Sequence, residues 1–237
     1  MGIGPGASEH RTHKATEVIQ SADVIAGYTP YMESLRDIIS KQRIVTSGMR
    51  AEVVRCREAL KLACEGQTVA LVSSGDAGIY GMAGLAMEMA AAESFDVEME
   101  VVPGVTAAST AAAKLGAPLM LDFAVVSLSD LLVPWDEIKT RIAAIAPLDM
   151  VLCLYNPKSK KRIFQIEETA SILRAHRDPD TPVGIGRNLG KEDEWVTLTK
   201  LSDFLNFKID MKSIVIVGGK STKCLGPYMV TARRYAL

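Results

Sequence analysis

The chain has 237 residues, of which 48% are hydrophobic and 23% are charged, and these ordinary proportions exclude an intrinsically disordered or low-complexity protein. Its 27 basic and 28 acidic residues give a net charge of -1, so no overall basic field is present to attract nucleic acid. No apolar run approaches the roughly 20 residues that a membrane helix needs, and no signal peptide opens the sequence, so we expect a cytoplasmic protein with no membrane or nucleic-acid partner.

The first half alternates short apolar runs with longer amphipathic ones, a rhythm typical of repeated β-strand and α-helix units. In the segment 51–65, Val53, Cys56 and Leu60 recur at helical spacing, and Gly66 follows as a helix-ending glycine. The pattern predicts a mainly parallel sheet covered by helices. The expected strands are 23–26, 43–46, 68–73 and 97–102, and the expected helices are 12–21, 31–39, 51–65, 79–93 and 106–115.

After Gly116 the pattern changes, because several strands are joined by loops too short for a crossover helix, and this predicts a mixed sheet with antiparallel pairs. We therefore expect an α/β chain of two domains, residues 1–118 and 119–237. The expected strands are 122–128, 149–154, 181–185, 194–199, 213–217 and 228–233, and the expected helices are 135–146, 162–174 and 201–207.

The four cysteines and three histidines show no spacing that suits a metal ion. We expect reduced thiols and no bound metal.

Two glycine-bearing loops follow strands of the first half, where α/β proteins bind ligands. In the loop 73–82, Gly75 and Gly78 permit a close backbone approach, and Asp76 is able to accept hydrogen bonds from a hydroxyl or an amine. The loop 103–107 leads into a run of small residues. The alternatives are a glycine turn in which Asp76 caps the next helix, and small residues that serve tight packing.

Two more unusual loops follow strands of the second half. Residues 154–157 (LYNP) lead into 158–162 (KSKKR), four cations in five residues, which oppose the dipole of the expected helix and favour an anionic ligand. A solvated surface run is the alternative. Residues 184–190 (GIGRNLG) carry glycines and one cation, and 217–220 (VGGK) repeat the theme more weakly.

The segment 2–6 (GIGPG) invites a dinucleotide-binding interpretation. The fingerprint of that fold is G-x-G-x-x-G between a strand and a helix, whereas here Pro5 breaks the spacing and no strand precedes the glycines. We therefore disfavour a nucleotide-binding oxidoreductase.

In this order and at these spacings the motifs resemble the tetrapyrrole (corrin/porphyrin) methylase family, the class III methyltransferases that use S-adenosylmethionine. The resemblance spans nearly the whole chain and is most specific for the branch that methylates C-17 of the corrin precursor. It rests on GIGPG (2–6), ADVIAGYTPY (22–31), GMR (48–50), VALVSSGDAGIYGMAG (69–84), VVPGVTAA (101–108), DFAVVSLSDLLVPW (122–135), LYNP (154–157) and GIGRNLG (184–190).

The resemblance implies two α/β domains, a homodimer, and S-adenosylmethionine in the cleft between the domains, leaving S-adenosylhomocysteine as product. The substrate implied is precorrin-3B or cobalt-precorrin-3 of cobalamin biosynthesis, which is methylated at C-17 and contracted. The implied cofactor-binding residues are Gly75, Asp76, Ile79, Tyr80, Thr106, Ala107, Tyr155, Asn156, Arg187, Asn188 and Gly218. The residues expected to bind substrate are Gly4, Pro5, Gly6, Ser127, Lys158 and Lys160.

Methyl transfer needs alignment of the two reactants and exclusion of water more than a covalent catalyst, which suits a chain without a Ser-His-Asp constellation. Ring contraction in this branch also needs proton transfers. The candidates for that step are Ser129, Asp130, His10 and His13.

One departure concerns the amino end, where family members begin with a strand of several apolar residues and this chain supplies only Met1 before the glycines. We expect either that native residues precede Met1 or that the sheet is completed in another way.

Two further functions stay open. One is a methylase of the same fold that acts on another corrin carbon or on a non-corrin substrate. The other is a ligand-binding protein without catalysis, which a turnover assay separates from an enzyme.

Overall fold

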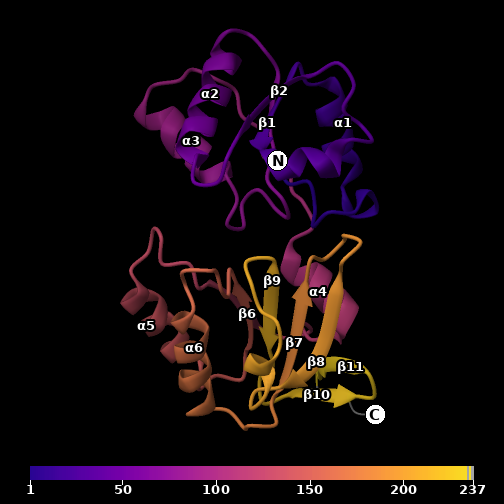
Figure 1. Ribbon diagram of the computed structural model, residues 1–237, viewed down its shortest axis with the longest axis vertical. Coiled ribbons are helices and arrows are strands. Elements are labelled where there is room, and N and C mark those ends of the chain that lie inside the picture. The colour runs from indigo at the N-terminus through magenta and orange to yellow at the C-terminus, as the bar shows by residue number, and fades with distance from the viewer. Residues whose placement is uncertain (234, 236–237) are drawn as a thin grey trace. The chain divides into compact units, whose positions relative to one another are not determined.

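The structure is a computed structural model that describes residues 1–233 and 235, and it contains two compact units, residues 1–107 (unit 1) and residues from 108 onward (unit 2) (Figure 1). The division falls after Ala107, earlier than the boundary expected between residues 118 and 119. Helix α4 (Ala107–Leu115) packs on the sheet of unit 2, so closely that a Cβ added to Gly184 would lie 2.2 Å from a methyl group of Leu115.

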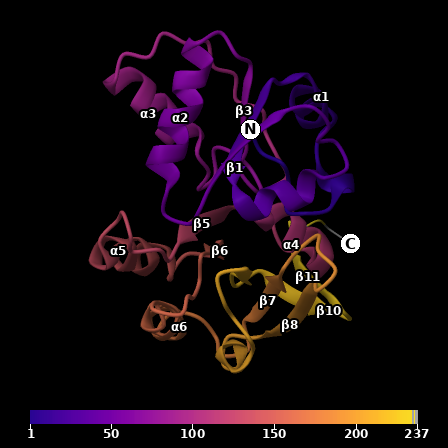
Figure 2. The same cartoon turned by 45° about the horizontal axis from the view of Figure 1, so that its top comes forward.

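Unit 1 holds a three-stranded parallel sheet in the order β2-β1-β3. Helix α1 covers one face, where Ile19 packs with Ile25, and α2 and α3 lie together on the other, where Leu60 packs with Met89 (Figure 2). Its elements are η1 (Ser8–His10), α1 (His13–Ser21), β1 (Val24–Tyr28), η2 (Thr29–Leu35), β2 (Arg43–Ser47), α2 (Glu52–Cys64), β3 (Val69–Leu71) and α3 (Ala83–Ala92).

Three expectations for unit 1 need correction. The helix expected over 31–39 is the 3-10 helix η2, which has a proline in its first turn. Helix α3 begins at Ala83 and not at residue 79, because Tyr80 takes a positive φ of 55° that an α-helix does not accept. Residues 97–102 are not assigned as a strand.

The first residues of the chain nevertheless join this sheet. Gly2 makes a parallel bridge with Ser73, and the Gly2 amide donates to the carbonyl oxygen of Val102 at 2.9 Å. The Met1 ammonium donates to the Leu71 carbonyl at 2.7 Å, and burial lowers the pKa of this amine, partly opposed by the charge of Asp76. Residues 1–4 thus supply the extended segment between β3 and the segment at Val102.

Unit 2 holds a mixed five-stranded sheet in the order β5-β6-β9-β7-β8, in which β5 and β6 are parallel and β9 runs antiparallel to both of its neighbours. A small sheet, β10-β11-β4, lies beside it. The elements after α4 are β4 (Gly116–Ala117), β5 (Phe123–Ser127), α5 (Trp135–Ile145), β6 (Val151–Tyr155), α6 (Phe164–Arg174), β7 (Pro182–Arg187), β8 (Trp195–Lys200), η3 (Phe204–Asn206), β9 (Ser213–Val217), β10 (Thr222–Leu225) and β11 (Tyr228–Thr231).

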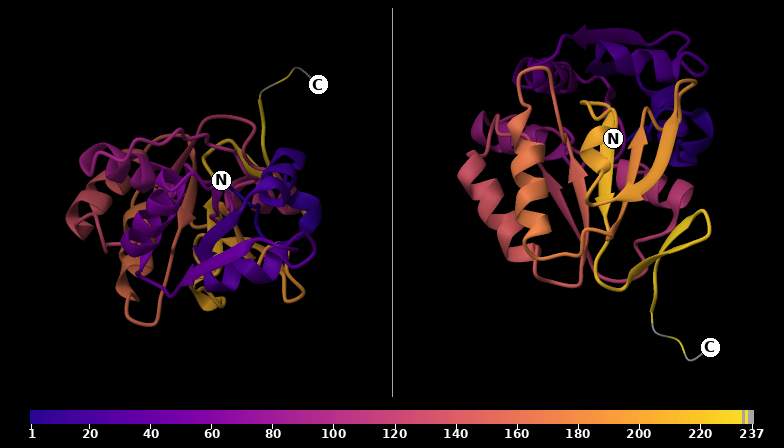
Figure 3. Two further views of the ribbon diagram at one scale, coloured as in Figure 1. Left: turned by 90° about the horizontal axis from the view of Figure 1, so that it is seen from above. Right: turned by 60° about the horizontal axis from the view of Figure 1, so that its bottom comes forward.

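Helices α5 and α6 lie side by side against one face of this sheet (Figure 3), and their apolar residues, among them Ile142 and Leu173, pack with Leu154 and Val215 in one core cluster. The parallel sheet of the first half and the mixed sheet of the second are confirmed. The helix expected over 201–207 shrinks to η3, and β10 was not expected.

In the described part of the chain, no helix has the length and apolar character that crossing a lipid bilayer requires.

Candidate functional site

Three glycines bring three segments of unit 1 to contact distance. A Cβ added to Gly104 would lie 2.1 Å from the carbonyl oxygen of Gly75 and 2.8 Å from the Cα of Gly2, and one added to Gly2 would lie 2.5 Å from the same oxygen. Gly75 itself has a φ of 64°. The loops that end β3 and the segment 97–102 therefore meet the amino end of the chain backbone to backbone, which only glycine permits.

The carboxylate of Asp76 ties these loops together. It accepts hydrogen bonds from the amide of Gly78 at 2.8 Å, within its own turn, and from the amide of Gly104 at 2.9 Å, in the neighbouring loop. The alternative that Asp76 caps the next helix is wrong, because α3 begins only at Ala83 and the Met82 amide there donates to Ser73. The Asp76 carboxylate therefore links the loop after β3 to the neighbouring loop at Gly104.

Exposed apolar side chains follow Asp76 in the same loop. Ile79 is 38% exposed and Tyr80 is 54% exposed, and both belong to the loop after β3. Thr106 and Ala107 stand at the start of α4, and their backbone lies 3.8–3.9 Å from a Cβ added to Gly75. The structure thus brings the unit 1 residues expected to bind the cofactor together at the carboxyl end of its sheet.

The GIGPG segment folds against η1. Gly4 has a φ of 77°, and a Cβ there would lie 2.7 Å from the carbonyl oxygen of His10. The Nδ1 atom of His10 is buried without a hydrogen-bond partner. His13 is exposed at the first turn of α1. Of the two histidines, His10 is therefore the one placed against the loop at Gly4.

In unit 2 the expected residues at the end of β6 bond to α4 and to the end of β5. The hydroxyl of Tyr155 accepts a hydrogen bond from the Ala108 amide at 2.8 Å, at the start of α4. Asn156 has a φ of 49°, and its side-chain amide donates to the hydroxyl of Ser127 at 3.0 Å. Ser127 also accepts from the amide of Ser129 at 3.2 Å.

The basic run 158–162 precedes α6, which begins at Phe164. Lys158 is half-buried, and Lys160 is exposed. Arg162, by contrast, is only 6% exposed and donates to the carbonyl oxygen of Asn156 at 2.8 Å. Part of the basic run is therefore buried, so neither a solvated surface nor a site for an anionic ligand describes all of its cations.

Arg187 and Asn188, at the end of β7, are engaged with acidic residues. Arg187 lies 2.9 Å from Asp210 and 3.7 Å from Asp193, and Asn188 donates to Asp193. Burial raises the pKa of Asp210, but hydrogen bonds from the Lys212 amide and from Arg187 outweigh it and lower the pKa below 3.8. The positive charge of Arg187 is thus already matched within unit 2.

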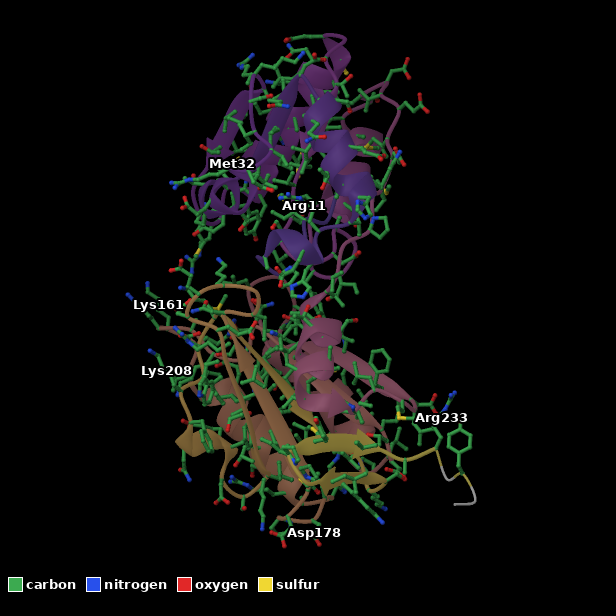
Figure 4. The ribbon with its side chains drawn as sticks, turned by 90° about the vertical axis from the view of Figure 1, so that its right-hand side faces the viewer. Arg11, Met32, Lys161, Asp178, Lys208 and Arg233 are labelled. Carbon is green, nitrogen blue, oxygen red and sulfur yellow. The ribbon has the colours of Figure 1, made fainter. Side chains whose placement is uncertain are left out.

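Gly218 lies at the other end of this sheet. Strand β9 is antiparallel to β6, and the pairing of Leu154 with Val215 places its beginning beside Tyr155. Gly218 follows the last residue of β9, so it lies about 13 Å along the strand from Tyr155, at about 3.3 Å per residue. There it accepts a hydrogen bond from Arg177 at 2.7 Å. Asp178, which lines the same hollow as Gly219, lies far from Lys161 within unit 2 (Figure 4).

Within residues 1–233 and 235, no three His, Cys, Asp or Glu side chains are grouped to hold a metal ion. Cys56 and Cys153 are buried and Cys64 and Cys224 exposed. Burial raises the pKa of the Cys153 thiol from 9.0 to about 12.

A family model described as Tetrapyrrole (Corrin/Porphyrin) Methylases matches residues 1–205. The chain is 43% identical to the "Probable cobalt-factor III C(17)-methyltransferase" of Salmonella typhimurium, over 100% of this chain and 98% of that protein. This chain belongs to the tetrapyrrole methylase family. It is also 46% identical to the "Cobalt-factor III methyltransferase" of Priestia megaterium, over 99% of this chain but only 44% of that longer protein. The crystal structure of the methyltransferase CobJ matches with a TM-score of 0.91 at 33% identity, over 98% of this chain and 97% of that one.

The predicted family, fold class and methyltransferase class are thereby confirmed. Within unit 2 of this methylase, the structure groups Ser127, Tyr155 and Asn156 at the carboxyl ends of β5 and β6, and the pairing with β9 places Arg187 at the same edge. It separates Gly218 from them.

Sequence reasoning did not single out Gln165. This side chain of the methylase is 2% exposed and donates to Asp130 at 2.8 Å. The signal was present, because Gln165 is a polar residue on the stripe of α6 that also carries Thr169 and Leu173, four and eight residues further on, and a buried polar group there needs a partner.

Proposed function

We propose that this methylase transfers a methyl group from S-adenosylmethionine to C-17 of cobalt-precorrin-3 or precorrin-3B and contracts the macrocycle, a step of cobalamin biosynthesis. The observation that carries the proposal is the likeness, over the whole chain and at 43% identity, to a relative named as a cobalt-factor III C(17)-methyltransferase. Because the relatives cited carry cobalt-factor III in their names, the cobalt-containing substrate is the one proposed first.

The loops of unit 1 fit the nucleoside of the cofactor. Each oxygen of an ionised carboxylate has two acceptor positions, so Asp76 keeps capacity for a ribose hydroxyl beyond its bonds to Gly78 and Gly104. The exposed side chains of Ile79 and Tyr80 offer apolar surface to a flat base. When bound, S-adenosylmethionine supplies a methyl group already activated by its sulfonium charge.

The protein's own contribution is alignment. Close backbone contacts pack the loops of unit 1 together, since a Cβ on Gly2 or on Gly104 would clash with the carbonyl oxygen of Gly75. Holding reactants in line supplies about 7 to 11 kcal/mol of barrier reduction. We assign this positioning to Asp76, Ile79 and the residues that start α4, with Tyr155 and Asn156 as the proposed cofactor residues of unit 2.

The substrate is a polycarboxylate, which gives the basic run a role. Lys158 and Lys160 are the side chains of that run proposed to meet its acidic groups. Ser127 and the loop 4–6 are proposed to line the substrate site.

Proton transfer during ring contraction is assigned to Asp130, with Ser129 and His10 as further candidates. Asp130 is half-buried and hydrogen-bonded, whereas the Nδ1 atom of His10 has no partner.

A homodimer and a cytoplasmic location also stay predictions. Light scattering of the purified protein tests the oligomeric state.

The deciding experiment offers the enzyme S-adenosylmethionine with cobalt-precorrin-3, and separately with precorrin-3B, and weighs the products. We expect a gain of one methyl group and one equivalent of S-adenosylhomocysteine. If neither substrate gains a methyl group, the C-17 assignment fails. A gain with one substrate alone decides between the cobalt-containing and the metal-free route.

A further inference from the structure

Two polar side chains are buried where α6 begins. Arg162 is 6% exposed and Gln165 is 2% exposed, although the other two cations nearest in the run, Lys160 and Lys161, are exposed. The buried face of a helix that packs on a sheet is normally apolar, and Ile166 and Leu173 on the buried face of α6 are apolar. Hydrophobic packing therefore does not explain why Arg162 and Gln165 are buried.

Gln165 holds the carboxylate assigned to proton transfer. Its amide nitrogen Nε2 donates to Oδ2 of Asp130 at 2.8 Å, across 35 residues of sequence. Its backbone carbonyl accepts from the hydroxyl of Thr169 at 2.7 Å, one turn further along α6. Because Gln165 is on a helix in the core of unit 2, it anchors a loop residue to a rigid element.

Arg162 holds the neighbouring turn. It donates to the carbonyl oxygen of Asn156 and to the sulfur of Met211, and in the described part of the chain no ion pair joins it to a carboxylate. Burial lowers the pKa of this guanidinium, and the nearby charge of Asp130 partly restores it. The buried cation and the carboxylate thus share one polar cluster at the ends of β5 and β6.

The cluster is not arranged for stability alone. The Nε atom of Arg162 and the Oε1 atom of Gln165 are buried without hydrogen-bond partners. A buried unsatisfied donor or acceptor costs about 1 to 3 kcal/mol, and well-packed apolar residues often replace buried polar groups without loss of stability. The hydrogen bond that the Gln165 amide nitrogen donates to Asp130 accounts for a glutamine at this position despite that cost.

We propose that Gln165 is a positioning residue of this enzyme: its amide holds the Asp130 carboxylate in the orientation from which it exchanges a proton with the substrate. Arg162 supports it by fixing the turn after β6 beside the same carboxylate. The inference rests on the proposed function, because Asp130 acquires its role there.

A double-mutant cycle on turnover tests the coupling. The variants are Gln165→Met, Asp130→Asn and the two combined, and the rate of contracted product is measured at saturating substrate. We expect each single variant to lower kcat by about 10-fold or more, as for a lost acid or base. The double variant is expected to be no slower than Asp130→Asn alone, because Gln165 acts only through Asp130.

Thr169→Val is the matched control. It removes a buried hydrogen bond on the same stripe of α6 without touching Asp130, so it is expected to lower thermal stability but to leave kcat near the wild-type value. Gln165→Glu, which has the same size, replaces Gln165→Met if the methionine variant does not fold, and it too is expected to lose rate because its carboxylate faces Asp130.

The possible outcomes separate the inference from the function. Rate losses that multiply in the double variant, or a Gln165 variant with wild-type kcat, overturn the positioning role while the function stands. A Thr169→Val variant as slow as Gln165→Met also overturns it. A wild-type enzyme that turns over neither substrate overturns the proposed function and the inference together.

Discussion

In unit 1 the loops at the end of the sheet meet through backbone atoms and one carboxylate, whereas in unit 2 the loop residues are joined by bonds between side chains. Gly2 and Gly104 leave no space for a Cβ beside the carbonyl oxygen of Gly75, and the Asp76 carboxylate accepts hydrogen bonds from backbone amides. In unit 2, Asn156 bonds to Ser127, and Gln165 bonds to Asp130.

The difference lies in which atoms make the contacts, because both sets of loops follow parallel strands. In unit 1 the loop after β3 and the loop at Gly104 pack by shape against the amino end of the chain. In unit 2 the loops after β5 and β6, which are parallel neighbours, are joined by the hydrogen bond between Asn156 and Ser127. Added atoms should therefore damage unit 1 most, and lost hydrogen bonds should damage unit 2.

The largest effect is expected for Gly104→Ala. The added Cβ would lie 2.1 Å from the Gly75 carbonyl oxygen, and the atoms in the way are backbone, so the unfolding free energy should fall by about 3 kcal/mol. Urea denaturation measures it. Gly84→Ala is the control, because nothing lies within 4 Å of its added Cβ and alanine favours the helix by about 0.5 to 1 kcal/mol. Equal effects of both variants would contradict the tight junction.

Arg187→Met should cost about 1 to 3 kcal/mol at pH 7, since it removes the charged hydrogen bond that Arg187 donates to the Asp210 carboxylate. Because the pKa of Asp210 is lowered in the folded protein, the stability that it contributes is present above pH 3.8 and is lost as the pH falls below that value. The gap between wild type and variant should therefore close in acid. A gap that persists at pH 2 would show that packing, and not charge, is what Arg187 supplies.

Gly218→Ala is expected to cost about 1 to 2 kcal/mol, because the added Cβ would lie 2.8 Å from the Cβ of Thr222. The affinity for S-adenosylhomocysteine, measured by calorimetry, should not change, because Gly218 lies at the opposite end of the sheet from Tyr155. Asp76→Ala is the comparison, and it should weaken that affinity by about 1 to 3 kcal/mol. A matching loss in Gly218→Ala would return Gly218 to the cofactor site.

The smallest effect concerns the thiols. With its pKa raised to about 12, Cys153 is neutral at pH 8, and the stability that it contributes is lost only as the pH rises above 9.0. In the native protein at pH 8, a thiol reagent should label Cys64 and Cys224 within the time that leaves Cys56 and Cys153 unmodified. Mass spectrometry of the labelled peptides checks this, and early labelling of Cys153 would show that β6 opens locally.

The local sequence determined most of the strands and helices, the two kinds of sheet and the glycine loops at strand ends, and these depend on periodicity and on residue types within a few positions. The family was indicated by the order and spacing of motifs along nearly the whole chain. The sequence pattern did not predict the 3-10 helix η2 or the late start of α3, because a proline turn and a positive φ at Tyr80 override a helical pattern.

Only the tertiary structure decided which of the loop residues meet. The antiparallel course of β9 moves Gly218 away from Tyr155, and the pairing of Gln165 with Asp130 joins residues that are 35 positions apart. The packing of α4 likewise places the division of the chain after Ala107. The order of the strands in a sheet and the contacts between distant segments result from how all elements pack, and no local pattern of residues encodes them.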